Sequence, residues 1–450
     1  MEKKPCFLKP FRIKNVEFRS RILRSSLGGR MAYYDGTISP VFKNFERQFA
    51  KAENLLGGII SATIDVDEKR CSPLEYPKLT KNTPIGPLGE VVAKVHDEGC
   101  RYIVQIGDPG GHTQTSILPD AADGKSASAF FDFYYGYRTK TSEMSVSEIH
   151  AEVDKFAAAA ALVRQAGADG VEVTASKGYI IHQFLNPATN RRTDEYGGSV
   201  EKRFRLLKEV VAAVRDAVGQ DFLFGVRLSA ADYNYLPINV RLPFAWPWTE
   251  RFRGNTLRTN LQYGAWLKER QVDYLHIDSG FGFINPKGSP GEYPIEGLRR
   301  FSNSVRHLSG KAKFRAWLLN TLPDGFARAT LGIGWKYVRA PNASFAQAFR
   351  QKLEMPIICN GGFQEREDIE GALEAGACDL IAIGRPLLAN PDLIARLAQN
   401  DFPEKPCTFC SRCCTYTTVL PLGCYDLSRF GGSNDAMEAQ ILRYSADSSP

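Results

Sequence analysis

Short apolar runs alternate along the chain with longer amphipathic segments. Small or polar residues directly follow the runs at residues 57–64, 101–106, 170–173 and 221–228. Among the segments with helical spacing, 149–166 is the clearest, because it is rich in alanine and contains no proline or glycine. Strands that alternate with helices at this pace predict a parallel α/β fold.

The same alternation returns in the last third of the chain. The pattern predicts helices at 259–270 and 367–375, and strands at 274–278, 356–359 and 380–383. We expect these units to close into a (β/α)8 TIM barrel, in which the loops after the strands form the catalytic face.

Three segments do not follow this pattern. Two strand-like runs at 6–13 and 16–23 predict a hairpin that plugs the barrel floor. The segments 231–254 and 283–345 are rich in proline, glycine and aromatic residues, and we expect irregular insertions there. They form either a lid or pocket wall, or a structural excursion over the barrel mouth. The expected division is a barrel over 1–400 and a cysteine segment with its tail over 401–450.

The stretch from residue 171 to 204 carries more chemistry than a connecting loop requires. It begins as an apolar strand, breaks at Gly178 and then enters a basic helix. Lys177, Tyr179 and His182 lie in the loop between them. Because such a loop lies on the catalytic face of a barrel, we expect the active site here.

Two consecutive predicted strands near the C-terminus end in small residues. Asn360, Gly361 and Gly362 follow the first strand, and Gly384 and Arg385 follow the second. Backbone N–H groups at such turns, together with an arginine, can hold a phosphate dianion. Tight turns that simply need glycine are the alternative, which leaves Arg385 unexplained.

Gln105 and Arg227 are polar residues within otherwise apolar strands. Buried polar groups need partners, and a flavin ring near the barrel mouth offers them. An amide can pair with the pyrimidine edge, and a guanidinium can stabilise the negative charge of the reduced ring. The alternative is that both side chains satisfy neighbouring backbone groups.

Five of the ten cysteines lie close together near the C-terminus, spaced Cys407-x2-Cys410-x2-Cys413-x10-Cys424, with Cys414 as an alternative third ligand. Four thiolates at this spacing can hold a [4Fe–4S] cluster or a tetrahedral zinc ion.

Composition narrows the class of protein. A hydrophobic content of 43% with 24% charged residues is ordinary for a globular enzyme. The net charge of +7 looks diffuse, so it favours an anionic ligand mildly and does not indicate nucleic acid. We expect a cytoplasmic protein with no membrane partner, because the chain shows no signal peptide and no apolar run of about 18 residues.

The sequence resembles the Old Yellow Enzyme family of FMN-dependent oxidoreductases over roughly residues 5–400 and into the cysteine segment. The resemblance rests on these stretches, in order: RSRILRSS, VQIGDPGG, AGADGVEV, GYIIHQFLNP, RTDEYGGS, FGVRLS, NGGF and AIGRPLLANPDL. By that likeness the FMN-binding positions include Ser25, Ser26, Gln105, Arg227, Gly362 and Arg385. Tyr179 matches the tyrosine that protonates the substrate after hydride transfer, a role that suits a group of high pKa.

The chain departs from the family pattern where a His/Asn or His/His pair usually holds the substrate carbonyl. Thr174 and Lys177 stand at those positions, and the related dienoyl-CoA reductases also lack the pair. Lys177 is either a cationic donor to a substrate carboxylate or enolate, or a solvated loop lysine. We expect His182 to be structural.

The resemblance implies an FMN-dependent enzyme that reduces the activated C=C bond of an unsaturated, in some cases anionic, small molecule. The larger iron–sulfur members of the family carry a similar cysteine segment, which favours a [4Fe–4S] cluster over zinc. Because no G-x-G-x-x-G motif follows a strand, electrons are expected from NAD(P)H directly or from a separate donor protein. We expect a homo-oligomer. The alternatives are oxidative demethylation or dehydrogenation of an amine, and a non-redox scaffold with a zinc-stapled tail.

Overall fold

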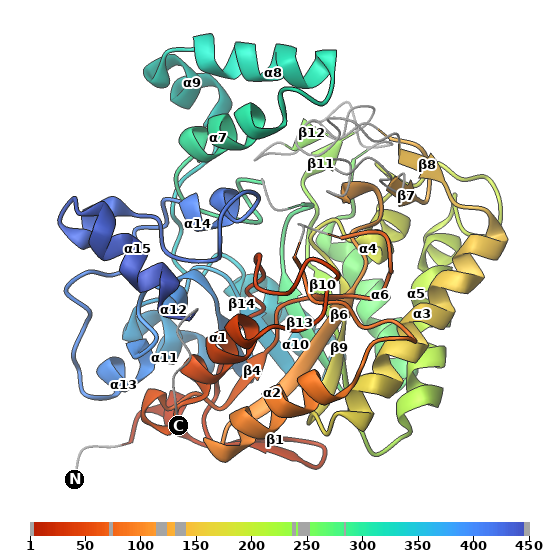
Figure 1. The fold of residues 1–450 in the computed structure, drawn as a ribbon. Coiled ribbons are helices and arrows are strands. Elements are labelled where there is room, and N and C mark those ends of the chain that lie inside the picture. The colour runs from red at the N-terminus through yellow and green to blue at the C-terminus, as the bar shows by residue number, and fades with distance from the viewer. Residues whose placement is uncertain are drawn as a thin grey trace.

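Eight parallel strands close into a barrel in the computed structural model, which describes residues 4–71, 75–113, 124–130, 141–235, 240–241, 253–282 and 285–444 (Figure 1). The ladder is continuous, because β15 pairs with β3, β3 with β4, and β4 with β6. A short strand, β5 (Ile64–Asp65), extends the pairing with β6. The predicted TIM barrel is therefore confirmed. Its strands are β3 (Ile22–Arg24), β4 (Gly58–Ile60), β6 (Arg101–Gly107), β9 (Gly170–Ala175), β10 (Leu223–Ser229), β13 (Tyr274–Asp278), β14 (Ile357–Asn360) and β15 (Leu380–Ile383).

Amphipathic helices cover the outside of the barrel. α3 begins with a capping box between Ser145 and Glu148, which satisfies backbone N–H groups of its first turn. It confirms the helix predicted at 149–166 and packs against α5. The covering helices are α1 (Pro40–Ala50), α2 (Gly86–Asp97), α3 (Val146–Gln165), α5 (Val200–Val218), α6 (Leu257–Glu269), α10 (Ala343–Leu353), α11 (Arg366–Glu374) and α13 (Leu393–Ala398).

The predicted hairpin is present as β1 (Phe11–Ile13) and β2 (Val16–Phe18). Ile13, Val16 and Phe18 are buried in one apolar cluster with side chains from inside the barrel. The hairpin therefore packs on the barrel floor. Residues 6–8 form a 3₁₀ turn rather than part of a strand.

The segment 283–345 is not irregular as predicted, because three helices form within it. They are α7 (Ile295–Val305), α8 (Gly310–Thr321) and α9 (Asp324–Leu331), and they form a lobe at one side of the barrel (Figure 1). In α7 the buried residues Ile295, Leu298 and Phe301 recur at helical spacing. The predicted insertion at 231–254 lies largely outside the described residues, which there include only β11 (Asn234–Tyr235), β12 (Val240–Arg241) and the flanking positions.

The cysteine segment folds back onto the barrel. It contains α14 (Arg412–Tyr416) and α15 (Asn434–Leu442). The Arg429 guanidinium donates to the backbone oxygen of Ala389, and Tyr444 packs edge-on against Phe45 of α1. The smaller elements are α4 (Ile180–Leu185), α12 (Arg385–Ala389), β7 (Gly124–Ser126) and β8 (Thr141–Glu143). Among the described helices, none has the length and apolar character needed to span a bilayer.

Candidate active site

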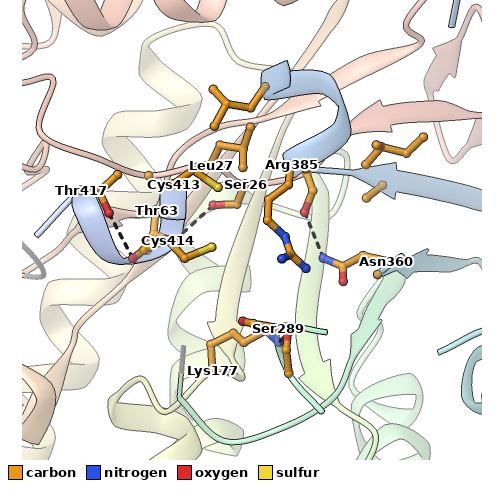
Figure 2. Close-up of a pocket in the computed structure, with 18 of the residues that line it drawn as sticks. Ser26, Leu27, Thr63, Lys177, Ser289, Asn360, Arg385, Cys413, Cys414 and Thr417 are labelled. Atoms are coloured by element: carbon orange, nitrogen blue, oxygen red, sulfur yellow. Dashed lines mark hydrogen bonds between the residues drawn. The ribbon is translucent and has the colours of Figure 1, made fainter. Parts of the chain in front are cut away.

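A cavity of about 190 Å³ lies at the carboxyl ends of the barrel strands (Figure 2). Its walls come from strand ends around the barrel, from residues 288–290 and from the cysteine segment. This is the position at which TIM barrels carry their active sites. We therefore expect the predicted site residues to line this cavity.

All nine residues predicted to bind the cofactor line this cavity. They come from the ends of β3, β6, β10, β14 and β15, which are distant in sequence and adjacent in space. These residues are Ser25, Ser26, Gln105, Arg227, Asn360, Gly361, Gly362, Gly384 and Arg385. The structure therefore brings the whole predicted set together.

The turn after β14 is built for a close backbone approach. Gly361 and Gly362 have φ values of +111° and +72°, which favour glycine over any residue with a side chain. Asn360 donates to the Ser25 hydroxyl at 3.0 Å and so fixes the turn to the end of β3 (Figure 2). Arg385 points into the cavity from the end of β15, and it donates to the backbone oxygen of Pro290 at 2.8 Å. One cation and the amides of a glycine turn are the groups that an anion needs.

Arg227 is held in place by a buried carboxylate. Its Nε donates to Asp278 Oδ2 at 2.8 Å, and both side chains are almost fully buried. Burial raises the pKa of Asp278, but Lys177 and Arg227 outweigh burial and lower it below the ordinary value. Asp278 is therefore ionised and fixes the guanidinium orientation at the cavity wall.

Gln105 is oriented by a second buried carboxylate. Its amide nitrogen donates to Glu172 Oε1 at 2.6 Å, and its amide oxygen accepts from the Thr63 hydroxyl. Burial raises the pKa of Glu172, but His276 and Arg227 outweigh burial and lower it. The amide thus reaches the cavity with a defined orientation.

Thr174 near the end of β9 and Tyr179 in the loop after that strand line the same cavity. The Thr174 hydroxyl is buried and has no hydrogen-bond partner among the described residues. Tyr179 is 3% exposed and begins α4. Gly107 makes room for both, because a Cβ there would lie 3.1 Å from the Tyr179 ring and 3.4 Å from Thr174 Cβ. A hydroxyl without a partner in a buried pocket is a group that a ligand would satisfy.

Lys177 lines the same cavity, so its role as a donor to a substrate carboxylate or enolate stays a prediction. It is 6% exposed, so it is not a solvated loop lysine. Its ammonium donates to the backbone oxygens of Ser279 and Gly288, each at 2.8 Å, and lies 3.7 Å from Asp278. Burial lowers the pKa of Lys177 to about 8. These contacts hold the loop after β13 against the cavity, so the ammonium is already engaged by the protein.

His182 is structural, as predicted. Its Nδ1 accepts from the backbone N–H of Gly178 at 3.0 Å, and its Nε2 pairs with Asp232 at 3.0 Å. Asp232 in turn accepts from Asn186 and from the backbone N–H of Asn255. This buried network fixes the loop that carries Tyr179.

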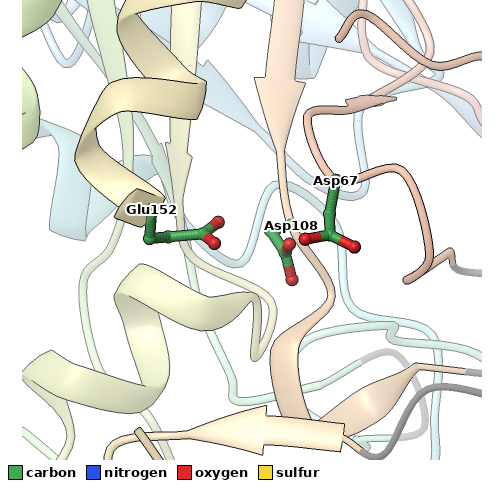
Figure 3. Close-up of side chains that lie close together, drawn as sticks. All are labelled: Asp67, Asp108 and Glu152. Carbon is green, nitrogen blue, oxygen red and sulfur yellow. The ribbon is translucent and has the colours of Figure 1, made fainter. Parts of the chain in front are cut away.

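A buried carboxylate cluster lies behind the same loop (Figure 3). Asp67, Asp108 and Glu152 place three carboxylate oxygens within 4.8 Å of one another. Arg70 pairs with all three, and Lys155 pairs with Asp67 and Glu152. Burial raises the pKa of Glu152 to about 7. The cations occupy the place that a metal ion would need, and the Asp108 backbone oxygen accepts from the N–H of Ile180, directly after Tyr179.

The four predicted metal ligands line a second, smaller cavity beside the first. All of Cys407, Cys410, Cys413 and Cys424 face it. Among the described residues only the carboxylate cluster brings three such ligand atoms within 4.8 Å, so no three of these sulfurs are that close. A tetrahedral zinc with Zn–S distances of about 2.3 Å requires sulfurs about 3.8 Å apart. The thiols are thus spaced more widely than a closed zinc site.

The structure also separates the two adjacent cysteines. Cys413 lines both cavities, whereas Cys414 lines only the first (Figure 2). Arg385 and Phe409 lie between the cavities, with the guanidinium 5.0 Å from the ring centroid. The two sites therefore share a wall.

Several residues of the site were missed at the level of sequence. Asp278 was predicted only as the end of a strand, although a charged residue after an apolar run is a recognisable signal. Gly288, Ser289 and Pro290 fell in the segment expected to be irregular. Thr63 gave no signal, because its role depends on Gln105, 42 positions away.

The family model for the NADH:flavin oxidoreductase / NADH oxidase family matches residues 7–236 and 322–403. The chain belongs to this family. The resemblance to the Old Yellow Enzyme family is therefore confirmed. The match omits residues 237–321, which contain α7 and α8.

Named relatives of this flavin oxidoreductase family are distant. An NADH oxidase of Thermoanaerobacter brockii is 25% identical over 385 residues, which are 85% of this chain and 49% of that protein. The chain thus spans about half of that relative's length. An NADPH dehydrogenase of Bacillus subtilis (strain 168) is 26% identical over 398 residues, covering 88% of this chain and 95% of that protein.

Solved structures show the same fold. A 2-naphthoyl-CoA reductase complex has a TM-score of 0.73 at 19% identity, covering 97% of this chain and 58% of that one. Morphinone reductase in complex with tetrahydroNAD has a TM-score of 0.64 at 22% identity, covering 90% and 94%.

Proposed function

We propose that the protein is an FMN-dependent reductase of activated C=C bonds. The observation that carries this proposal is the convergence of Gln105, Arg227, Thr174, Tyr179 and Arg385 on one cavity at the barrel mouth. Family membership supports FMN as the cofactor and NAD(P)H as its reductant.

The residues present fit FMN in two parts. Gln105 and Arg227, oriented by Glu172 and Asp278, are the groups for the polar edge of the flavin ring. The backbone amides of residues 360–362 and 384, together with Arg385, are the groups for the phosphate, and Ser25 and Ser26 line the wall between them. When bound, FMN supplies hydride transfer between the nicotinamide and the substrate.

The chain's own residues act on the substrate side. Tyr179 gives its phenolic proton to the carbon next to the activating group, and solvent later replaces that proton. The unpartnered Thr174 hydroxyl donates to the activating oxygen of the substrate. Lys177 holds the backbone at Ser279 and Gly288 beside the cavity that it lines.

For the four cysteines that face the second cavity, we favour a [4Fe–4S] cluster over zinc. The four thiols face one cavity, and their sulfurs lie farther apart than a tetrahedral zinc allows. Such a cluster would supply one-electron transfer next to the flavin cavity. The lining of the second cavity, which includes Cys413 and not Cys414, supports Cys413 as the third ligand.

The direct test starts from the purified protein. We expect a yellow-brown preparation that releases FMN on heating and whose flavin is bleached anaerobically by NADH or NADPH. Reaction of the flavin is then measured with a panel of enones, unsaturated acids, thioesters and amines. Reduction of the oxidised flavin by amines, with no reoxidation of the reduced flavin by any unsaturated compound, would replace the reductase by an amine-oxidising enzyme. A colourless protein with stoichiometric zinc would contradict the proposal altogether.

A further inference from the structure

The excess positive charge of the chain is concentrated in one lobe and is not diffuse. Residues 295–339 contain nine lysines and arginines and only two acidic residues. This surplus of seven equals the net charge of the whole chain, which is +7, so the remaining residues are neutral overall. The charged segment includes helices α7, α8 and α9, the lobe at one side of the barrel in Figure 1.

The same lobe carries much of the exposed apolar surface. Half of the ten large apolar side chains that are exposed in the described part of the chain lie between residues 314 and 333. On α8, Phe314 is 61% exposed and Trp317 is 58% exposed, and their ring centroids are 5.7 Å apart. Aromatic residues gathered on a surface mark an interaction site more often than a chance exposure.

Basic residues surround this aromatic pair. Arg306 at the end of α7 and Lys311 and Lys313 in the first turn of α8 are exposed. We call Arg306, Lys311, Lys313, Phe314 and Trp317 the basic-aromatic face. Cations in the first turn of a helix oppose its dipole, so the helix dipole does not favour Lys311 and Lys313 at these positions. Their placement instead suits an acidic partner.

The lobe is fixed to the cysteine segment. Gly297 of α7 approaches α14 so closely that a Cβ there would lie 1.9 Å from the Thr415 hydroxyl. Arg300 lies over the Tyr416 ring at 4.9 Å, and Arg412 pairs with Glu296 at 3.0 Å. A partner on α8 would therefore bind a lobe that is in direct contact with the cysteine segment.

We propose that the basic-aromatic face docks a small acidic electron-carrier protein. Charge complementarity selects an acidic partner and disfavours a second copy, because a symmetric contact would place like charges opposite one another. Because the lobe is in contact with the cysteine segment, a redox protein is favoured over a membrane surface as its partner. The electron route rests on the proposed function, whereas the docking surface does not. Two reduced carriers, each giving one electron, supply the two electrons that reduction of a C=C bond takes up together with two protons.

Binding is measured first, without nicotinamide or substrate. The probe is an acidic plant-type [2Fe–2S] ferredoxin, with basic cytochrome c as the control probe, in titration calorimetry at low salt and at about 150 mM salt. We expect micromolar binding of ferredoxin that weakens with salt, and no binding of cytochrome c. Lys311→Glu/Lys313→Glu should weaken ferredoxin binding about tenfold or more. The matched control Lys202→Glu/Lys208→Glu, on the exposed side of α5, changes the net charge equally and should bind within about twofold of wild type.

Electron transfer is measured next. Reduced ferredoxin should bleach the flavin anaerobically at a rate that falls with the Lys311/Lys313 reversal, while reduction by NAD(P)H stays unchanged. Equal effects of the two charge-reversal pairs, or binding without electron transfer, would overturn the proposal. So would binding to anionic phosphatidylserine vesicles in place of ferredoxin, or a dimer that Trp317→Ala dissociates. A failure of the proposed function would appear separately, as absent FMN or absent C=C reduction with ferredoxin binding intact.

Discussion

Replacing Lys177 by methionine tests whether this lysine positions the loop at the active site. The ammonium donates to the backbone oxygens of Ser279 and Gly288 and lies 3.7 Å from Asp278. Methionine keeps most of the side-chain volume but removes both donated hydrogen bonds. Two buried acceptors would lose their partners, at about 1–3 kcal/mol each. Removing a buried charge offsets part of that cost, so the stability difference at one pH is not diagnostic.

The pH dependence of stability is diagnostic. Burial lowers the pKa of Lys177 from its ordinary value of 10.5 to about 8. Between these values the unfolded state binds more protons than the folded state, so the free energy of unfolding rises with pH. From pH 7 to pH 10 the gain spans nearly two pKa units, or about 2.5 kcal/mol. The methionine variant lacks this gain.

Urea unfolding of both proteins at pH 7, 8, 9 and 10, followed by circular dichroism, measures the difference directly. From pH 7 to pH 10 the free energy of unfolding of wild type should rise by about 2.5 kcal/mol more than that of Lys177→Met. Lys177→Arg, which does not titrate here, should follow the methionine variant. Lys287→Met removes an exposed lysine of the same loop and should follow wild type. Parallel stability curves for wild type and Lys177→Met would refute the buried, engaged lysine.

Three further substitutions probe the site. Arg227→Ala should weaken FMN retention by roughly 10–100-fold, the scale of a charge-assisted hydrogen bond, as measured by flavin release on dialysis; full occupancy in a folded variant would remove it from the cofactor site. Gly107→Ala should lower the free energy of unfolding by about 1–3 kcal/mol through overpacking, and it should slow substrate reduction at least about tenfold. In the control Gly371→Ala the added Cβ has nothing within 4 Å, so neither stability nor rate should fall. Cys413→Ala should lose most of about four irons per chain in an anaerobic iron assay, and Cys414→Ala should keep them; the reverse order would exchange their roles.

Much of the fold could be predicted because its signals are local. The strands at 274–278 and 380–383 have the predicted bounds, since each is a short apolar run between polar residues. The helices at 149–166, 259–270 and 367–375 were predicted to within a few residues for the same reason, whereas α10 and α13 were not predicted. The α7–α9 lobe was missed because its glycines, prolines and aromatic residues suggested loops. Its helices are stabilised by contacts with one another and with α14, which no local pattern shows.

The candidate site, like the fold, could be predicted only where its signals are local. Strand ends of parallel strands meet at one edge, so Gln105, Arg227 and Arg385 could be grouped from their positions alone. What could not be predicted are pairings between distant segments. The carboxylate that orients Arg227 comes from β13, 51 positions later, and the acceptors for Lys177 lie 102 and 111 positions away. These contacts fix the position of Lys177 at the cavity wall.

The central claim is that Tyr179 supplies the proton for reduction of a C=C bond at a flavin. The measurement that tests it most directly is anaerobic stopped-flow kinetics of Tyr179→Phe, with the two half-reactions followed separately. Phenylalanine keeps the ring packed near Gly107 but removes the proton. Reduction of the flavin by NAD(P)H should stay within a few fold of wild type, and reoxidation by the unsaturated substrate should slow by about 10²–10⁴-fold. Reoxidation of Tyr179→Phe at the wild-type rate would contradict the account.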